Sequence, residues 1–257
     1  MKKLIINADD YGYTPGVTHG ILSAHLNGVV TSTTALTVSE YFEQAMKLAR
    51  YFPTLKIGVH LTLTLNGGRP LLGDRVPSLT NSDGTFWNQR EFEDKVDLKE
   101  VEDEWFEQVN RFYCSGMVPT HIDSHHGVHC KNEELLKIAV KIAKHFGLPL
   151  RNCARYEERI PMLKNYGDVK TTDRIISTFY GDLVTIKHFE ELADEIKHSD
   201  SETFEVNCHP AFIDNVLMNS SVYIYERLEE YNLLTSDAIK EILKKRNIEL
   251  TSFETLK

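Results

Sequence analysis

Acidic and imidazole side chains gather at four places in this sequence, each beside a short apolar run. Asp9 and Asp10 lie in NADDYG, and His60 lies within IGVHLTL. The stretch THIDSHHGVH, residues 120–129, carries four histidines, and His209 lies near the end of TFEVNCHP. Imidazole and carboxylate donors together suit Zn²⁺, Mn²⁺, Co²⁺ or Fe²⁺, and with more oxygen ligands Mg²⁺. A histidine can also act as a general acid or base, because its pKa lies near working pH.

Taken singly, each of these residues has an ordinary structural explanation. Asp9 or Asp10 could cap the helix that follows, and a lone strand histidine such as His60 is commonly a satisfied core residue. His209 could be buried with a hydrogen bond to the backbone, and the histidines of 120–129 could be solvated. Taken together, ligands from three strands with open positions for water describe a catalytic metal site.

Short apolar runs alternate with helical patterns along the chain. Expected strands cover residues 3–7, 31–37, 56–63, 121–123, 148–151, 203–208 and 248–251. Amphipathic helices are expected over 98–115, 132–146, 185–198 and 236–246. This alternation predicts an α/β fold with parallel strands and right-handed crossovers. Seven such strands suit a closed or nearly closed barrel better than an open sheet, although the pattern leaves closure open.

The polar clusters follow the expected strands, and the carboxyl ends of parallel strands share one face. We therefore expect Asp9, His60, residues 120–129 and His209 to converge there. Arg151 lies at the end of the fifth expected strand and belongs to the same face.

One segment interrupts the alternation within a single expected domain, residues 1–257. Residues 66–97 are rich in Gly and Pro and include NSDG, and a loop of this length in a compact domain is usually functional or disordered. We interpret it as a lid or wall over the active face; the alternative is a surface excursion without a role. Phe86 and Trp87 lie within it.

The composition limits the function further. The chain has 257 residues, a formal charge of −9, 41% hydrophobic residues and 26% charged residues, which excludes a disordered chain. An acidic balance argues against nucleic-acid binding, which draws on clustered Lys and Arg. A small anionic substrate held by one or two arginines is compatible with it. Arg155, Arg159 or Lys164 could meet a phosphate, although surface charge would equally explain them.

Neither an export signal nor a membrane helix is expected, because no apolar stretch has the required length. The four cysteines show no CxxC spacing. We interpret them as free thiols in a reducing cytoplasm, in preference to a disulfide framework or a zinc knuckle.

Several ordered motifs together resemble the YdjC-like carbohydrate deacetylases, typified by the chitooligosaccharide deacetylases. The motifs are NADDYG, GVVTSTTAL, IGVHLTL, PTHIDSHHGVH, CHPAFIDN and LLTSDAIK, spread over nearly the whole chain. The resemblance implies a distorted (β/α) barrel related to the polysaccharide deacetylases. It also implies one divalent metal ion, usually Mg²⁺, and hydrolysis of an acetamide.

Carried over by position, the resemblance implies that Asp10, His60 and His125 are the metal ligands. It further implies that Asp9 is the catalytic base, that His209 is the acid and that Arg151 holds Asp9. The chain departs from the family at Gly127, where members often have a further histidine.

The expected activity is removal of N-acetyl groups from small N-acetylglucosamine sugars of the chitobiose type, phosphorylated or not, in the cytoplasm. Tyr11, Tyr13, Phe86 and Trp87 are candidates for stacking on the sugar. The expected partner is a small sugar, without nucleic acid or membrane, and the family favours a homodimer. Two alternatives stay open: a barrel phosphoesterase or amidohydrolase, and a non-catalytic sugar-binding regulator.

Overall fold

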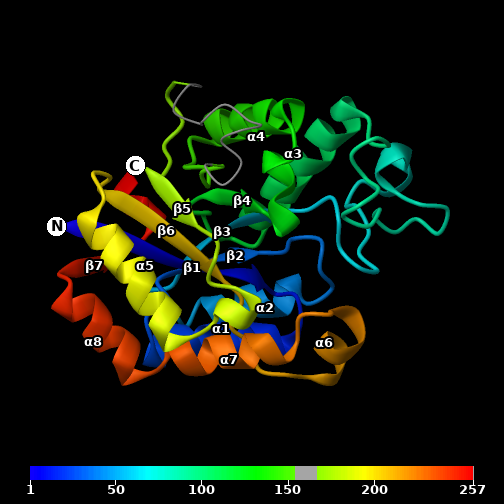
Figure 1. Ribbon diagram of the computed structural model, residues 1–257. Coiled ribbons are helices and arrows are strands. Elements are labelled where there is room, and N and C mark those ends of the chain that lie inside the picture. The colour runs from blue at the N-terminus through cyan, green and yellow to red at the C-terminus, as the bar shows by residue number, and fades with distance from the viewer. Residues whose placement is uncertain (154–166, 257) are drawn as a thin grey trace.

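The computed structural model describes residues 1–153 and 167–256 of the chain. Within these residues one sheet of seven strands forms the centre, in the order β4-β3-β2-β1-β6-β5, with β7 also on β1. The strands are β1 (Lys2–Tyr11), β2 (Ser32–Ala35), β3 (Lys56–Leu61), β4 (Ile122–Ser124), β5 (Arg174–Ile176), β6 (Thr203–Cys208) and β7 (Ile248–Thr251). All pairings between them are parallel. The sheet curls into a half-barrel (Figure 1), which confirms the predicted α/β barrel-like class.

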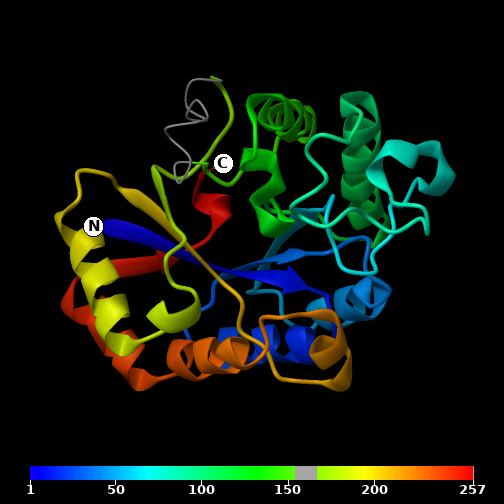
Figure 2. The same ribbon diagram turned by 45° about the vertical axis from the view of Figure 1, so that its right-hand side comes forward.

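Helices connect the strands and cover the outside of the sheet, as parallel pairing requires. They are α1 (Pro15–Asn27), α2 (Phe42–Ala49), α3 (Leu98–Cys114), α4 (Glu133–Phe146), α5 (Ile186–His198), α6 (Asn215–Ser220), α7 (Tyr225–Leu234) and α8 (Asp237–Lys245). Figures 1 and 2 show α3 and α4 above the sheet, and α1, α7 and α8 below it. Within the described residues, no helix combines the length and apolar content that a membrane span needs.

Local sequence signals explain where the main helices begin and end. Thr14 accepts a hydrogen bond from the Val17 backbone, directly before the proline that opens α1. Asn132 caps α4 in the same way, and Gly147 closes that helix with φ of 65°. These caps fix where α1 begins and where α4 begins and ends.

The end of β1 carries a bulge that decides which way its acidic residues point. Ala8 pairs with Thr33 and Tyr11 with Ala35, so β1 advances one residue more than β2 over this stretch. Asp10 takes up the extra residue with a left-handed φ of 74°. In a regular strand Asp9 and Asp10 would face opposite sides, whereas here both line the same cavity.

One predicted strand was wrong, and one strand was not predicted. Residues 148–151 form no strand, because Leu150 makes only an isolated bridge to Ile122. The strand β5 lies instead at Arg174–Ile176, a region without a clear apolar run, where it pairs with β6 at one edge of the sheet.

The segment 66–97 packs against α3 through hydrogen bonds from its backbone to acidic side chains. Glu104 accepts bonds from the backbone N–H groups of Leu71 and Leu72, and Glu100 accepts from Ser78. A row of residues from this segment, including Trp87, lines the cavity described below. The segment is therefore a wall of that cavity.

Candidate active site

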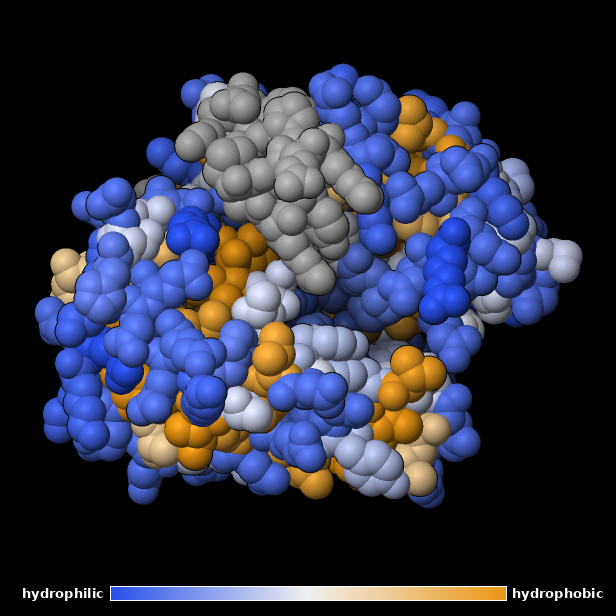
Figure 3. Space-filling model, in the orientation of Figure 1, coloured by the Kyte–Doolittle hydropathy of each residue, from blue (hydrophilic) through white to orange (hydrophobic). Residues whose placement is uncertain are grey.

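The predicted catalytic and metal-binding residues meet in one cavity of about 880 Å³ at the carboxyl ends of the strands. Figure 3 shows the face of the molecule with this hollow near its middle. The six residues that the sequence placed at the reacting centre all line it: Asp9, Asp10, His60, His125, Arg151 and His209. They come from the ends of β1, β3, β4 and β6 and from the chain that follows α4.

Asp10, His60 and His125 form a compact donor set at the floor of the cavity. One ligand atom from each lies within 4.8 Å of the others. Asp10 Oδ1 lies 2.9 Å from His125 Nδ1 and 3.3 Å from His60 Nε2. All three side chains are buried, yet they border the cavity. Two imidazoles and one carboxylate fit a divalent metal ion, with space for further ligands on the cavity side.

Asp123 orients His60 through the ring nitrogen opposite the one that faces Asp10. Its Oδ1 lies 2.6 Å from His60 Nδ1, and its Oδ2 accepts a hydrogen bond from Thr34. This leaves His60 Nε2 facing Asp10, as in metal sites whose histidine is held by a carboxylate. Burial alone would lower the pKa of His60, but the charge of Asp123 and the bond to Asp10 raise it to about 10. The carboxylates therefore stabilise positive charge at this point, whether a proton or a metal ion.

The charge of the buried cluster supports a cation there. Five buried carboxylates surround the site: Asp9, Asp10, Asp123, Glu205 and Glu230. Two buried guanidinium groups face them, from Arg151 and Arg227. Five negative charges against two positive ones leave three without a guanidinium, and buried charges require partners. Protons on His60 and His209 together with a neutral Glu205, whose pKa burial raises to about 7, would balance them, and so would a divalent ion and one proton.

Arg151 holds Asp9 in a two-pronged ion pair. Its Nη1 and Nη2 donate to the two oxygens of Asp9 over 2.8 and 2.6 Å, and Asn7 donates a third hydrogen bond. Glu205 anchors the same guanidinium through Nε at 2.7 Å. Burial opposes ionisation of Asp9, but the attraction of Arg151 outweighs it and holds its pKa far below the usual range. Asp9 is therefore an ionised carboxylate at neutral pH.

His209 lies on the other side of Asp9. Its Nε2 is 4.0 Å from Asp9 Oδ2, and its Nδ1 is 3.8 Å from Glu230 Oε1. The backbone N–H of His209 donates to the same Glu230 carboxylate. Burial lowers the pKa of His209, but the nearby Glu230 carboxylate outweighs it and raises the pKa. The cavity thus contains an ionised carboxylate and an imidazole that favours its protonated form.

The profile of the YdjC-like protein family matches residues 3–245 of the chain. The chain belongs to this family.

Relatives within the family have a common description. A carbohydrate deacetylase of Enterococcus faecalis strain V583 is 51% identical over 257 residues, which cover 99% of this chain and 98% of the relative. A carbohydrate deacetylase of Brevibacillus brevis is 37% identical over 99% of each chain.

Solved structures agree with the observed fold. The crystal structure of a putative cellobiose-phosphate cleavage protein from Enterococcus faecalis V583 has a TM-score of 0.97 at 51% identity, covering 99% of this chain and 98% of its own. A family 4 carbohydrate esterase from Streptomyces lividans, in complex with acetate, has a TM-score of 0.50 at 9% identity, covering 99% of this chain and 95% of its own. The latter likeness concerns the fold alone.

Sequence reasoning missed the contribution of α7 to this YdjC-like site. Arg227 donates from Nη2 to Asp10 Oδ2 over 2.7 Å, and its Nε donates to the Tyr223 carbonyl. Glu230 lies one helical turn further and faces His209. Burial opposes the charge of Arg227, but Asp10 raises its pKa, so the pair stays ionic and directs the other oxygen of Asp10 toward the histidines.

The structure contradicts a sugar contact by Tyr11. Its ring is fully buried in the core, and its hydroxyl donates to the Ala45 carbonyl over 2.9 Å. The bulge in β1 explains this, because it turns Asp10 toward the cavity and Tyr11 away from it. Trp87 does line the cavity; its Nε1 donates to Ser78, and Lys95 Nζ lies 3.6 Å from the ring centroid. Its role as a sugar contact stays a prediction.

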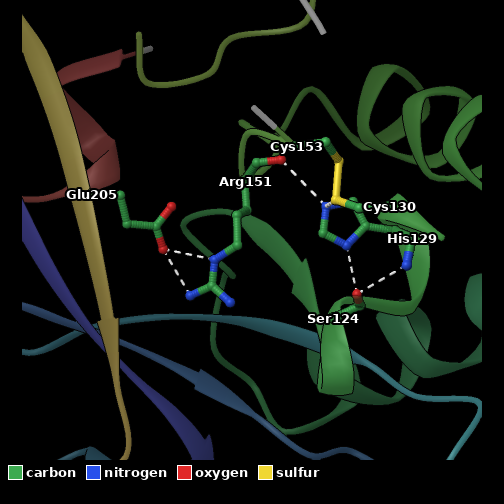
Figure 4. Close-up of a disulfide and its surroundings, with 6 residues drawn as sticks. All are labelled: Ser124, His129, Cys130, Arg151, Cys153 and Glu205. Carbon is green, nitrogen blue, oxygen red and sulfur yellow. Dashed lines mark hydrogen bonds and ion pairs between the residues drawn. A yellow bond between two sulfur atoms is a disulfide. The ribbon is translucent and has the colours of Figure 1, made fainter. Parts of the chain in front are cut away.

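The expectation of four free cysteines was also wrong. Cys130 and Cys153 form a disulfide, whereas Cys114 and Cys208 are free. Figure 4 shows this bond beside His129, whose Nε2 lies 3.3 Å from the carbonyl oxygen of Arg151. The sequence separation of 23 gave no signal, because pairing depends on the 5.6 Å between the two Cα atoms in the fold.

The disulfide ties together two parts of the site. It joins the turn His125–Cys130, which begins with a predicted metal ligand, to the chain two residues after Arg151. The candidate phosphate contacts Arg155, Arg159 and Lys164 lie outside the described residues.

Proposed function

We propose that the chain is a metal-dependent hydrolase that removes N-acetyl groups from small N-acetylglucosamine sugars and releases acetate. Its family and its relatives, named carbohydrate deacetylases, support the reaction class. One observation carries the mechanism: ionised Asp9 and His209 lie 4.0 Å apart, beside the donor set of Asp10, His60 and His125.

In this proposal Asp9 is the general base and His209 the general acid. A bound divalent ion would polarise the acetyl carbonyl and lower the pKa of the attacking water. Asp9 accepts the proton of the attacking water at a carboxylate oxygen, and Arg151 keeps that carboxylate ionised and fixed. His209 then donates a proton to the leaving nitrogen, because an amide nitrogen leaves poorly without one. Water and acetamide become acetate and the free amine.

The identity of the metal is part of the proposal. Mg²⁺ is the prediction from family resemblance, whereas two imidazoles and one carboxylate suit Zn²⁺, Mn²⁺ or Co²⁺ better by donor chemistry. Calorimetric titration of chelator-treated protein with each ion would rank them. In Asp10→Asn the binding should weaken for every ion, because a charged ligand is lost.

The substrate is expected to be a chitobiose-type sugar. The cavity of about 880 Å³ lies within the usual range for a ligand of drug size, and Trp87 in its wall is the proposed sugar contact from segment 66–97. The name of the similar crystal structure, a putative cellobiose-phosphate cleavage protein, supports testing phosphorylated disaccharides as well. A homodimer and a cytoplasmic location are further predictions; the Cys130–Cys153 disulfide removes the free-thiol argument for the cytoplasm, because disulfides are rare there.

Acetate release tests the proposal. Metal-loaded protein should release acetate from N-acetylglucosamine, chitobiose or their phosphates, and chelation should abolish the release reversibly. Asp9→Asn should lose roughly 100-fold or more in kcat, as expected for a general base, whereas His198→Gln on the exposed side of α5 should match the wild type. If the metal-loaded wild type releases no acetate from any sugar of this panel, the substrate assignment is wrong.

A further inference from the structure

Two stacked tyrosines lie beside His209 at the cavity. The rings of Tyr180 and Tyr223 are 4.1 Å apart between centroids and nearly parallel, at 7°. Both meet the His209 ring edge-to-face, with centroid distances of 5.6 and 5.9 Å. Tyr180, Tyr223 and His209 all line the same cavity. Their sequence positions gave no hint of this grouping, since Tyr180 precedes a short turn far from every recognised motif.

The two tyrosine rings differ in how much of their surface is exposed. Tyr223 is 8% exposed, and its hydroxyl donates to Glu230 over 2.7 Å and accepts from the backbone N–H of Gly181. Tyr180 is 49% exposed. The inner ring is thus fixed by hydrogen bonds and packing, and it supports an outer ring that remains available to a ligand.

The other aromatic residues that line the cavity have less accessible rings than Tyr180. Phe86 is 4% exposed and Tyr13 is 9% exposed, so both rings are almost fully covered. Trp87 is partly buried, and Lys95 occupies a position over its ring. Among the described residues that line the cavity, Tyr180 is therefore the aromatic residue whose ring is both largely exposed and supported by a second ring.

The chemistry of a pyranose ring matches this surface. Such a ring carries hydroxyl groups around its edge and C–H groups on its faces, and the negative face of an aromatic ring attracts polarised C–H groups. In the proposed reaction His209 protonates the nitrogen that is bonded directly to the sugar ring. The sugar unit that carries the acetamide must therefore lie within a few ångströms of His209, where Tyr180 also lies.

We propose that Tyr180, supported by Tyr223, is the binding platform for the sugar unit that carries the scissile acetamide. This inference rests on the proposed function and names the subsite for the ring of that substrate. Tyr180 contributes affinity through its face, so the aromatic ring matters and the hydroxyl does not.

Steady-state kinetics with Tyr180→Ala test the platform. Loss of one aromatic contact should raise KM roughly five- to tenfold, with kcat changed much less because Asp9 and His209 remain. Tyr180→Phe should restore most of the affinity, since it keeps the ring. Tyr225→Ala is the matched control, because Tyr225 is exposed and absent from the cavity lining.

Equilibrium binding separates this inference from the proposed function. Chitobiose binding to Asp9→Asn, with and without Tyr180→Ala, can be measured by calorimetry without turnover. A weaker Kd in the double variant supports the platform, even if the wild type released no acetate. An unchanged Kd and KM in Tyr180→Ala would overturn the inference, and so would a Tyr180→Phe variant that is as impaired as Tyr180→Ala.

Discussion

Replacing Glu230 by Gln removes one negative charge from behind His209 while keeping the size of the side chain. Glu230 is fully buried on α7, accepts a hydrogen bond from Tyr223 and lies with Oε1 3.8 Å from His209 Nδ1. Because its charge raises the pKa of His209, the substitution should lower that pKa.

The geometry sets the size of the effect. At an effective dielectric constant of about 20, two unit charges 3.8 Å apart attract by about 4 kcal/mol. Asp9 remains 4.0 Å from the other nitrogen of His209 and retains part of the stabilisation. We therefore expect the pKa of His209 to fall when the charge of Glu230 is removed, with the charge of Asp9 limiting the fall.

The pH dependence of kcat/KM measures this shift. A general acid must be protonated, so activity is lost as pH rises through its pKa. In Glu230→Gln the alkaline limb should therefore move to lower pH. Glu229→Gln is the matched control, because Glu229 is the neighbouring residue of the same helix and is exposed. An alkaline limb that stays in place in a folded Glu230→Gln enzyme would refute the role of this charge.

Three further outcomes are expected. Asp123→Asn should weaken metal binding roughly 10- to 100-fold in calorimetric titration, because His60 loses its charged partner; an unchanged Kd would contradict this. Substitution of both Cys130 and Cys153 by Ser should lower the free energy of unfolding by about 3 kcal/mol in urea, and a reductant should destabilise the wild type but not this variant. Tyr11→Phe should cost about 1 kcal/mol of stability and leave KM unchanged, whereas a raised KM would restore the idea of a sugar contact.

The strand-end residues could be anticipated from the sequence because parallel sheet geometry is restrictive. Once Asp9, His60, His125 and His209 are assigned to strand ends, a barrel-like sheet brings them to one edge whatever their separation along the chain. The repeating apolar runs were sufficient for this, although they left barrel closure open. In the described residues the sheet ends at β4 and β5 and stays a half-barrel.

The supporting residues of α7 could not be anticipated in this way. Arg227 and Glu230 lie in YERLEEYNLL, where charged residues are as common as on any solvated helix. Only the packing of α7 shows that these two are buried against Asp10 and His209. The disulfide could not be predicted for the same reason. The three-dimensional fold brings Cys130 and Cys153 together, and their spacing in the sequence does not indicate this.

The bulge at the end of β1 places two separate demands on position 10. Its backbone has a left-handed φ of 74°, which Gly, Asn and Asp adopt at little cost and β-branched residues do not. Its side chain must also offer an anionic oxygen to His60 and His125, which leaves aspartate as the residue that meets both. Asp10→Gly would keep the backbone conformation but lose the donor atom and the partner of Arg227, whereas Asp10→Val would strain the main chain as well. A comparison of these two variants would therefore separate conformational tolerance from ligand chemistry at a single residue.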